Sequence, residues 1–338
     1  MLMKKIAVLT SGGDAPGMNA AIRAVVLAAQ QHQLTIIGFK YGYNGLIDNE
    51  NIQLGRHNID GIIQRGGTIL KSARCAQMHT TLGLKQAATT LIKEKIDALI
   101  VIGGDGSFNG LLALKAYWQG QIIGIPGTID NDVDGTDHTI GFATAVNTAI
   151  DAIDKIRDTA NAFERIFIIE LMGRHSGHIT FNVGVACAAE QVLSFENFSV
   201  DSTEETLKQL STDILHSQKN RHNSYLIVIA ENLWPGGATE LAKQLKKIAN
   251  IDITACILGY IQRGGSPVAK DRILATKLGV AAVQAVLEGK TNLMIGEQNA
   301  EISFIPLEQA VKHLKCVSPS LVEAQENILA ITSNHSKC

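Results

Sequence analysis

Short apolar runs alternate along the chain with longer segments whose apolar positions recur at helical spacing. The runs are rich in Ile, Val and Leu and lack strict alternation of apolar and polar positions, which is typical of parallel strands buried on both faces. They occupy residues 6–9, 35–39, 98–102, 122–125, 166–169, 225–230 and 253–258. Each run is therefore predicted to be a strand of a parallel sheet.

The segments between the runs have the period of amphipathic helices. Apolar residues lie three and four positions apart in residues 22–29, 143–153 and 274–285. In the second of these segments the acidic residues Asp151 and Asp154 fall largely on the side away from the apolar face. Repeated alternation of strand and helix over this length predicts an α/β fold with mainly parallel sheets.

Composition refines this prediction. A chain of 338 residues suggests two domains at about 150 residues each, and 46% hydrophobic residues is enough for a sizeable core. The 30 Lys and Arg against 32 Asp and Glu give a net charge of −2. The unusual counts are 31 glycines against 6 prolines. Such a glycine excess indicates places where the backbone turns tightly or approaches another group closely.

Several classes of protein are disfavoured. The near-neutral charge and the absence of Lys/Arg tracts argue against nucleic-acid and polybasic membrane partners. No apolar run reaches the roughly 18 residues of a membrane span, and the apolar residues 6–9 are too short for a signal-peptide core. The five cysteines are scattered without a C-x-x-C, so neither a disulfide framework nor a zinc site is expected. We expect a cytoplasmic enzyme.

The glycines cluster where three predicted strands end, in residues 11–17, 103–107 and 126–132. Ligands of open parallel sheets bind beyond the carboxyl ends of strands, and glycine lets backbone N–H groups reach a phosphate. The same three loops carry carboxylates, namely Asp14, Asp105, Asp130 and Asp132. Together these features predict a site for an anion and a metal ion, rather than glycines that only turn the chain.

Common nucleotide signatures are missing from these loops. The sequence has no G-x-x-x-x-G-K-[ST], and the first strand does not lead into G-x-G-x-x-G. The carboxylates instead favour Mg²⁺ shared with phosphates, because Mg²⁺ typically takes one or two protein carboxylates. Asp130 and Asp132 are two residues apart, so one could position metal while the other accepts a proton.

Arginines lie beside glycines or near strand ends, where guanidinium groups could bind several phosphates. They are Arg65, Arg74, Arg165, Arg174, Arg263 and Arg272. Residue chemistry alone therefore predicts an Mg²⁺-dependent phosphoryl transferase acting on a small phosphorylated substrate. It does not identify a sugar.

Two distant segments share nearly the same sequence, I-Q-R-G-G-T at residues 63–68 and I-Q-R-G-G-S at residues 261–266. This similarity is either a coincidence or a pair of tight turns that each present an arginine. Spacing alone does not decide between the two.

Five strings together resemble the bacterial ATP-dependent 6-phosphofructokinases. They are L-T-S-G-G-D-A-P-G-M-N at residues 9–19, G-G-D-G-S at 103–107, the loop 126–132, M-G-R at 172–174 and G-Y-I-Q-R-G-G-S-P at 259–267. They keep the order and spacing of that family from residue 4 to about residue 275, whereas residues 300–338 do not align.

The resemblance implies a fold of two Rossmann-like α/β lobes with mainly parallel sheets, with the chain crossing between them. Residues 1–140 and 253–305 are expected to form an ATP-binding lobe, and residues 141–252 and 306–338 a lobe that binds the sugar phosphate. It also implies an allosteric homotetramer with sites near subunit contacts. The implied glycolytic reaction converts fructose 6-phosphate and ATP to fructose 1,6-bisphosphate and ADP.

The resemblance also assigns roles to residues. Asp130 would take the proton from the sugar 1-hydroxyl, Thr128 and Arg174 would lie near the transferred phosphoryl group, and Asp105 would hold Mg²⁺ with help from Asp132. The ATP-binding residues implied are Gly13, Arg74, Cys75, Gly104, Asp105, Gly106 and Ser107. The substrate-binding residues implied are Thr128, Ile129, Asp130, Arg165 from a neighbouring subunit, Met172, Gly173, Arg174, Glu231, Tyr260 and Arg263.

Two glycines indicate which phosphoryl donor the protein is expected to use. Relatives that use pyrophosphate usually carry Asp where Gly106 stands and Lys where Gly127 stands. A carboxylate at position 106 would repel a nucleotide near its α-phosphate. Glycine at both positions therefore favours ATP.

The chain also departs from the family pattern. Thr254 replaces an arginine that reaches the sugar 6-phosphate from the neighbouring subunit, and Tyr260 replaces a histidine. Losing one charge-assisted hydrogen bond costs about 1.5–3 kcal/mol, so weak fructose 6-phosphate binding is predicted. In the nucleotide effector site four residues match, but Leu27 replaces an arginine, which predicts blunted allosteric control. The matching residues are Arg23, Arg56, Arg157 and Glu190.

Two other functions are compatible with parts of the sequence. NAD and lipid kinases share G-G-D-G, but that interpretation requires the family resemblance of the first loop and of residues 126–132 to be a coincidence. A catalytically silent regulatory subunit is favoured only by Thr254, and Asp105, Thr128, Asp130 and Arg174 argue against it.

Overall fold

The computed structural model describes residues 5–163, 165–219, 224–249 and 252–334. The chain divides into two compact units. Unit 1 comprises Met1–Thr144 and Arg263–Lys315, and unit 2 comprises Ala145–Gln262 and Cys316–Cys338. Among the helices that the structure describes, none combines the length and apolar character needed to span a membrane.

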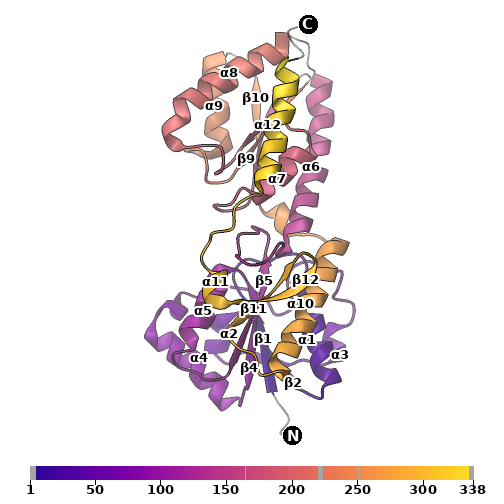
Figure 1. Cartoon of the computed structure of the whole chain (residues 1–338), viewed down its shortest axis with the longest axis vertical. Helices are drawn as coiled ribbons and strands as arrows, with labels where there is room; N and C mark the ends of the chain where they lie inside the picture. The colour runs from indigo at the N-terminus through magenta and orange to yellow at the C-terminus, as the bar shows by residue number, and fades with distance from the viewer. Residues whose placement is uncertain (1–4, 164, 220–223, 250–251, 335–338) are drawn as a thin grey trace. The chain divides into compact units, whose positions relative to one another are not determined.

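Unit 1 is built on a mainly parallel sheet with the strand order β12-β11-β5-β4-β1-β2-β3, while β6 pairs with β5 (Figure 1). The pairs β2–β3 and β11–β12 are antiparallel. The strands are β1 (Lys5–Thr10), β2 (Thr35–Phe39), β3 (Asn51–Gln53), β4 (Ala98–Gly103), β5 (Gln121–Thr128), β6 (Ile140–Gly141), β11 (Leu293–Gln298) and β12 (Glu301–Pro306). The central strands β1 and β4 are almost wholly buried, which explains their continuous apolar runs.

Helices cover both faces of this sheet (Figure 1). On one face α1 packs against α10 and α3. On the other, α4, α5 and α11 contribute to a core with β1 and β4 that includes Leu9, Val101 and Phe108. The helices of unit 1 are α1 (Met18–Gln31), α2 (Tyr43–Ile47), α3 (Arg56–Ile59), η1 (Ala76–His79), α4 (Thr81–Lys93), α5 (Asp105–Leu114), α10 (Ala269–Leu287) and α11 (Leu307–Ala310).

Unit 2 has a parallel sheet in the order β10-β7-β9-β8. Its strands are β7 (Ile166–Leu171), β8 (Gln191–Leu193), β9 (Tyr225–Ala230) and β10 (Ile253–Ile257). Apolar residues of α8 and α9 pack onto the sheet in one core, and α7 packs against α12. The remaining elements are α6 (Phe142–Phe163), η3 (Gly259–Arg263), α7 (His178–Ala186), η2 (Val200–Ser202), α8 (Thr203–Lys219), α9 (Gly237–Ala249) and α12 (Pro319–Asn334). Helix α6 spans the unit boundary after Thr144, and η3 spans the boundary after Gln262.

The α/β prediction with mainly parallel sheets is confirmed. All seven apolar runs are strands, and the three helical segments lie within α1, α6 and α10. The strands that the pattern does not predict are two or three residues long or belong to the antiparallel pair β11–β12. Burial in β12 is mostly partial or absent, so no continuous apolar run marks it.

All three unit boundaries differ from the expected ones at residues 140/141, 252/253 and 305/306, and the first is shifted by four residues, to 144/145. Residues 253–262 belong to unit 2, because β10 pairs with β7 along its whole length. Residues 306–315 belong to unit 1, because α11 packs on α5 and the residues after it contact the loop that follows β5. Tertiary pairing, which composition does not reveal, sets the second and third boundaries.

Candidate active site

Three glycine-rich loops meet at one edge of the sheet in unit 1. They follow β1, β4 and β5, which are adjacent and parallel. Thr10 pairs with Ile102, and Gly103 pairs with Pro126, so the three strands reach this edge at the same level. The loops are therefore neighbours, as the sequence predicts.

The first loop is held by the segment that carries Arg74 and Cys75. Gly12 adopts a φ of 87°, which favours glycine, and its carbonyl accepts a hydrogen bond from the Ser72 hydroxyl at 2.8 Å. An ideal Cβ on Gly13 would lie 3.0 Å from Nη1 of Arg263. The guanidinium of Arg263 therefore lies against the backbone that is expected to bind ATP.

The second loop leads into the N-terminus of α5. Asp105 is the first helical residue, Gly106 is exposed and Ser107 is buried. The hydroxyl of Tyr43 donates a 2.7 Å hydrogen bond to the Ser107 carbonyl, and burial raises the pKa of Tyr43. Backbone N–H groups of a first helical turn form a favourable environment for a phosphate.

The third loop carries Asp130. The Asp130 amide donates to Oγ1 of Thr128 at 3.2 Å, and the Thr128 carbonyl accepts a 2.6 Å bond from the Thr139 hydroxyl. An ideal Cβ on Gly104 would be 3.6 Å from Cβ of Thr128. The second and third loops therefore approach each other at Gly104 and Thr128, while Ile129 is buried beneath the third loop.

The carboxylates of these loops suit Mg²⁺. Asp105 and Asp132 are half-buried, and Nε2 of His313 lies 3.0 Å from Oδ2 of Asp105. Within the described ranges no group of three or more His, Cys, Asp or Glu side chains has a metal-binding arrangement. Mg²⁺ needs only one or two protein carboxylates when phosphates and water complete its shell. The hard oxygen donors of Asp105 and Asp132 fit that requirement.

Unit 2 brings together four of the predicted sugar-binding residues. Met172, Gly173 and Arg174 follow β7, and Glu231 follows the adjacent parallel strand β9. Oε1 of Glu231 accepts hydrogen bonds from the amides of Gly173 at 3.1 Å and Arg174 at 2.7 Å. Buried Gln262 accepts a bond from the Met172 amide at 2.9 Å. Glu231 and Gln262 therefore shape the loop 172–174.

Two other predicted substrate-binding residues, Arg165 and Tyr260, lie elsewhere in unit 2, as does Thr254, which replaces the arginine of the family pattern. Arg165 directly precedes β7, whereas Met172 follows its carboxyl end, so the strand separates them. Tyr260 is 78% exposed in η3. Thr254 is half-buried in β10, which is the edge of the sheet order given above. Within one chain, Arg165 is not brought to the loop 172–174.

The four residues of the expected effector site form two local groups. Arg23 lies in α1 and Arg56 begins α3, and these helices pack together in unit 1. In unit 2 the guanidinium of Arg157 lies 3.5 Å from the Glu190 carboxylate and donates to the Cys187 carbonyl at 2.6 Å. The assignment of these residues to an effector site stays a prediction.

The two I-Q-R-G-G turns contact each other. The Ser266 hydroxyl donates to the Gln64 carbonyl at 2.8 Å. An ideal Cβ on Gly66 would lie 2.3 Å from the Gly265 carbonyl oxygen, so no larger residue fits at position 66 without a shift. The repeated I-Q-R-G-G sequence thus corresponds to two turns packed backbone to backbone.

Sequence reasoning missed three residues of this region. Asn131 lies inside the motif 126–132, but nothing in the motif marks its amide as a hydrogen-bonding centre. His313 and Lys315 lie outside the five strings that carry the family resemblance, yet they contact Asp105 and Asn131. Their only signal is the cationic stretch K-H-L-K itself.

Comparisons with known proteins agree with this architecture. A family model described as Phosphofructokinase matches residues 5–286. The chain is 46% identical over 329 residues to "ATP-dependent 6-phosphofructokinase 1" of Thermus thermophilus, which covers 97% of this chain and 100% of that protein. It is 44% identical over 328 residues to "ATP-dependent 6-phosphofructokinase 2" of Bacteroides thetaiotaomicron, covering 96% and 98%.

Solved structures give the same result. The crystal structure of Pichia pastoris phosphofructokinase in the T-state matches with a TM-score of 0.87 and 31% identity, over 98% of this chain and 39% of that longer chain. A pyrophosphate-dependent phosphofructokinase from Nitrosospira multiformis matches with a TM-score of 0.81 and 20% identity, over 96% and 92%, which supports the fold alone. Because the family model matches residues 5–286 and the similar proteins span nearly all of its length, the chain belongs to the phosphofructokinase family.

Proposed function

We propose that the chain is an ATP-dependent 6-phosphofructokinase. It transfers the γ-phosphoryl group of ATP to the 1-hydroxyl of fructose 6-phosphate, which yields fructose 1,6-bisphosphate and ADP. The observation that carries this proposal is the 46% identity, over 97% of the chain, to a protein named ATP-dependent 6-phosphofructokinase. The three loops of unit 1 provide the carboxylates and backbone amides that such a reaction requires.

In this reaction Asp130 accepts the proton of the attacking hydroxyl. Its amide is fixed to Thr128 Oγ1 at 3.2 Å, so its backbone belongs to a short hydrogen-bonded turn. General base catalysis contributes about 10²–10⁴-fold, and positioning and charge neutralisation supply most of the remainder in phosphoryl transfer. Thr128 lies beside the transferred group and Arg174 stabilises its charge.

The nucleotide is bound by the Gly13 backbone, Arg74, Cys75 and residues 104–107. The N-terminus of α5 supplies amides for phosphate oxygens. Asp105 holds Mg²⁺ and Asp132 assists it. When bound, Mg²⁺ neutralises phosphate charge during the transfer.

The sugar phosphate is bound mainly by residues of unit 2. Glu231 binds sugar hydroxyls and Met172 and Gly173 line the sugar pocket. Arg263, Tyr260 and, from a neighbouring subunit, Arg165 bind the 6-phosphate region. Because Arg165 comes from a neighbouring subunit, the proposal includes a homotetramer. The proposal also places the enzyme in the cytoplasm. No nucleic acid or membrane partner is required.

The test is a coupled assay of ADP release from ATP in the presence of fructose 6-phosphate and Mg²⁺. Wild-type protein is expected to release ADP, and Asp130→Ser to be about 1,000-fold slower because the base is lost. Retained binding of ADP by the variant controls for folding.

Release of ADP with NAD or a lipid in place of the sugar phosphate would favour the corresponding kinase. Binding of sugar phosphate without any ADP release would favour a silent regulatory subunit. Either outcome contradicts the proposed function.

A further inference from the structure

Residues 313–315 follow α11 and contact the site loops of unit 1 with three consecutive residues. His313 meets Asp105 at 3.0 Å. The Leu314 amide donates to both carboxylate oxygens of Asp134, at 2.9 and 3.0 Å. The Lys315 ammonium donates to Asn131 Oδ1 at 2.8 Å. A segment from late in the chain thus reaches one loop that lies 180–184 residues earlier and another that lies still earlier in the sequence.

Asn131 is the centre of the loop that carries Asp130. It is 3% exposed and has a φ of 54°, a left-handed conformation that asparagine tolerates better than most residues. Its Oδ1 accepts the Thr139 amide at 3.0 Å, and its Nδ2 donates to the Asp137 carbonyl at 3.3 Å. These bonds close residues 131–139 into a fixed turn. Asp130 and Asp132 flank Asn131, so its position constrains the backbone of both carboxylates.

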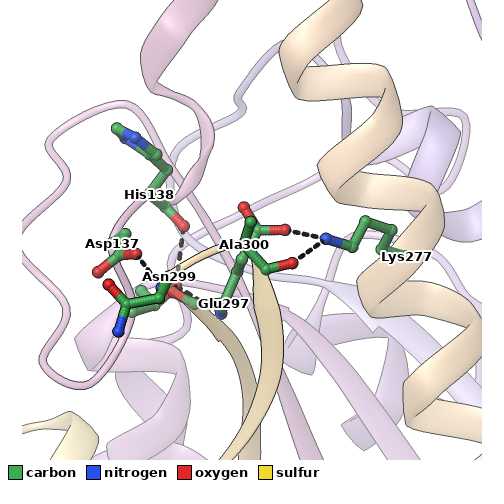
Figure 2. A network of polar contacts seen from close by, with 7 residues as sticks. Asp137, His138, Lys277, Glu297, Asn299 and Ala300 are labelled. Carbon is green, nitrogen blue, oxygen red and sulfur yellow. Dashed lines mark hydrogen bonds and ion pairs between the residues drawn. The ribbon is translucent and has the colours of Figure 1, made fainter.

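The far side of the same turn is held by the hairpin β11–β12 (Figure 2). The Asp137 amide donates to the Glu297 carbonyl at 2.7 Å, and the Asn299 amide donates to Oδ2 of Asp137 at 2.7 Å. Lys277 in turn binds the Glu297 carboxylate and the Ala300 carbonyl. The Asp137 end of the turn is therefore anchored to unit 1 without Lys315.

Lys315 supports the opposite end. Its ammonium bonds to Asn131 Oδ1 and, at 3.0 Å, to the Asp137 carbonyl, so it bridges both ends of the turn. Burial lowers the pKa of Lys315 to about 8, although the carboxylates of Asp137, Asp132 and Asp134 act in the opposite direction. An ammonium in a half-buried position is costly unless it is well paired. That cost is offset here by bonds to the turn beside the proposed base.

We propose that Lys315 is a positioning residue for phosphoryl transfer, because it fixes Asn131 and thereby the carboxylate of Asp130 against the substrates. The inference rests on the proposed function and adds to it a residue outside the family motifs. A group that only stabilised the fold would change the melting temperature. A positioning group changes kcat far more than either KM.

The experiment compares Lys315→Met with Lys312→Met, a matched control whose lysine lies three residues earlier and is exposed. In the coupled assay Lys315→Met is expected to lower kcat about 100-fold, as a displacement of roughly 1 Å can do. Both KM values are expected to stay within about threefold of wild type. Lys312→Met is expected to match wild type in all three parameters.

A second variant keeps the test decisive if Lys315→Met does not fold. The amide of Lys315→Gln can still donate to Asn131 but carries no charge, so its kcat is expected to lie between those of wild type and Lys315→Met. The inference is overturned if the variants at position 315 keep kcat within threefold of wild type, if only KM changes, or if Lys312→Met loses as much activity. An inactive wild type overturns the proposed function, and this inference with it.

Discussion

At the scale of single residues, Gly106 and Gly127 are glycines for different reasons. An ideal Cβ on Gly106 meets no heavy atom within 4 Å. An ideal Cβ on Gly127 would lie 2.9 Å from Ile102 Cγ2 and 3.2 Å from Met18 Cε. Packing alone therefore explains Gly127, whereas nothing in the fold requires glycine at position 106. The space beside Gly106 is available to a ligand.

Replacement of Gly106 by Asp is expected to preserve the fold and impair ATP use. The new carboxylate fits, and a negative charge is favourable in the first turn of α5. Beside a phosphate about 5 Å away it is unfavourable by about 3 kcal/mol, so KM for ATP should rise roughly 100-fold.

Gly106→Ala is the matched control, because it adds a methyl group without charge. Initial rates at varied ATP measure both variants. An unchanged KM in Gly106→Asp would show that position 106 does not face the donor.

At the scale of elements, the long helix α6 depends on a carboxylate from another helix. Asp271 of α10 is 1% exposed, and it accepts the amides of Gly141 at 3.0 Å and Thr144 at 2.7 Å as well as the Thr144 hydroxyl. Burial raises the pKa of Asp271, while these hydrogen bonds act against that shift. A carboxylate at a helix N-terminus also interacts favourably with the helix dipole.

Asp271→Ala is expected to lower the free energy of unfolding by about 2–4 kcal/mol, because it leaves buried amides without their acceptor. Since the folded pKa is raised, the native state holds its proton at a higher pH than the unfolded state. The stabilising contribution of Asp271 is then largest at acid pH and declines as pH rises through the raised value.

Urea denaturation at several pH values measures this difference. Asp158→Ala removes an exposed carboxylate from α6 and is expected to change stability by less than about 0.5 kcal/mol. Equal effects of the two substitutions would contradict a capping role for Asp271.

At the scale of the whole molecule, the sugar-phosphate site is expected to need more than one chain. Arg165 and the loop 172–174 lie at opposite ends of β7, so one chain does not bring them together around a single ligand. Thr254, where the family has an arginine, lies in the edge strand β10 in register with Phe167. The proposed function therefore predicts a site that lacks one cation, at a position that a neighbouring subunit is expected to supply.

Thr254→Arg is expected to lower KM for fructose 6-phosphate roughly tenfold or more, because it restores a charge-assisted hydrogen bond of about 1.5–3 kcal/mol. Steady-state kinetics measure the gain, and Thr254→Ser should leave KM unchanged. Light scattering checks that the oligomer is the same in all three proteins. No gain in the arginine variant would contradict the missing-cation hypothesis.

Much of the fold could be predicted from the sequence. The runs at residues 35–39 and 225–230 coincide with β2 and β9, because a strand buried on both faces must be apolar throughout. β12 could not be found in this way, since its partial burial leaves no continuous apolar run. The boundaries at residues 262/263 and 315/316 were also hidden, because they depend on which strand β10 pairs with and where α11 packs.

The candidate site, like the fold, could be predicted from the sequence only in part. By itself the sequence determined the three glycine-rich loops and their carboxylates, because the residues expected to approach a phosphate are contiguous in each loop and need no distant partner to be recognised. Only the tertiary structure decided what holds those loops. Asn131 is a centre of hydrogen bonds only because Thr139, Asp137 and Lys315 all bond to its side chain. Lys315 comes from a segment with no recognisable motif. A hydrogen bond between residues 184 positions apart leaves no periodic signal in the chain, so folding alone brings its two ends together.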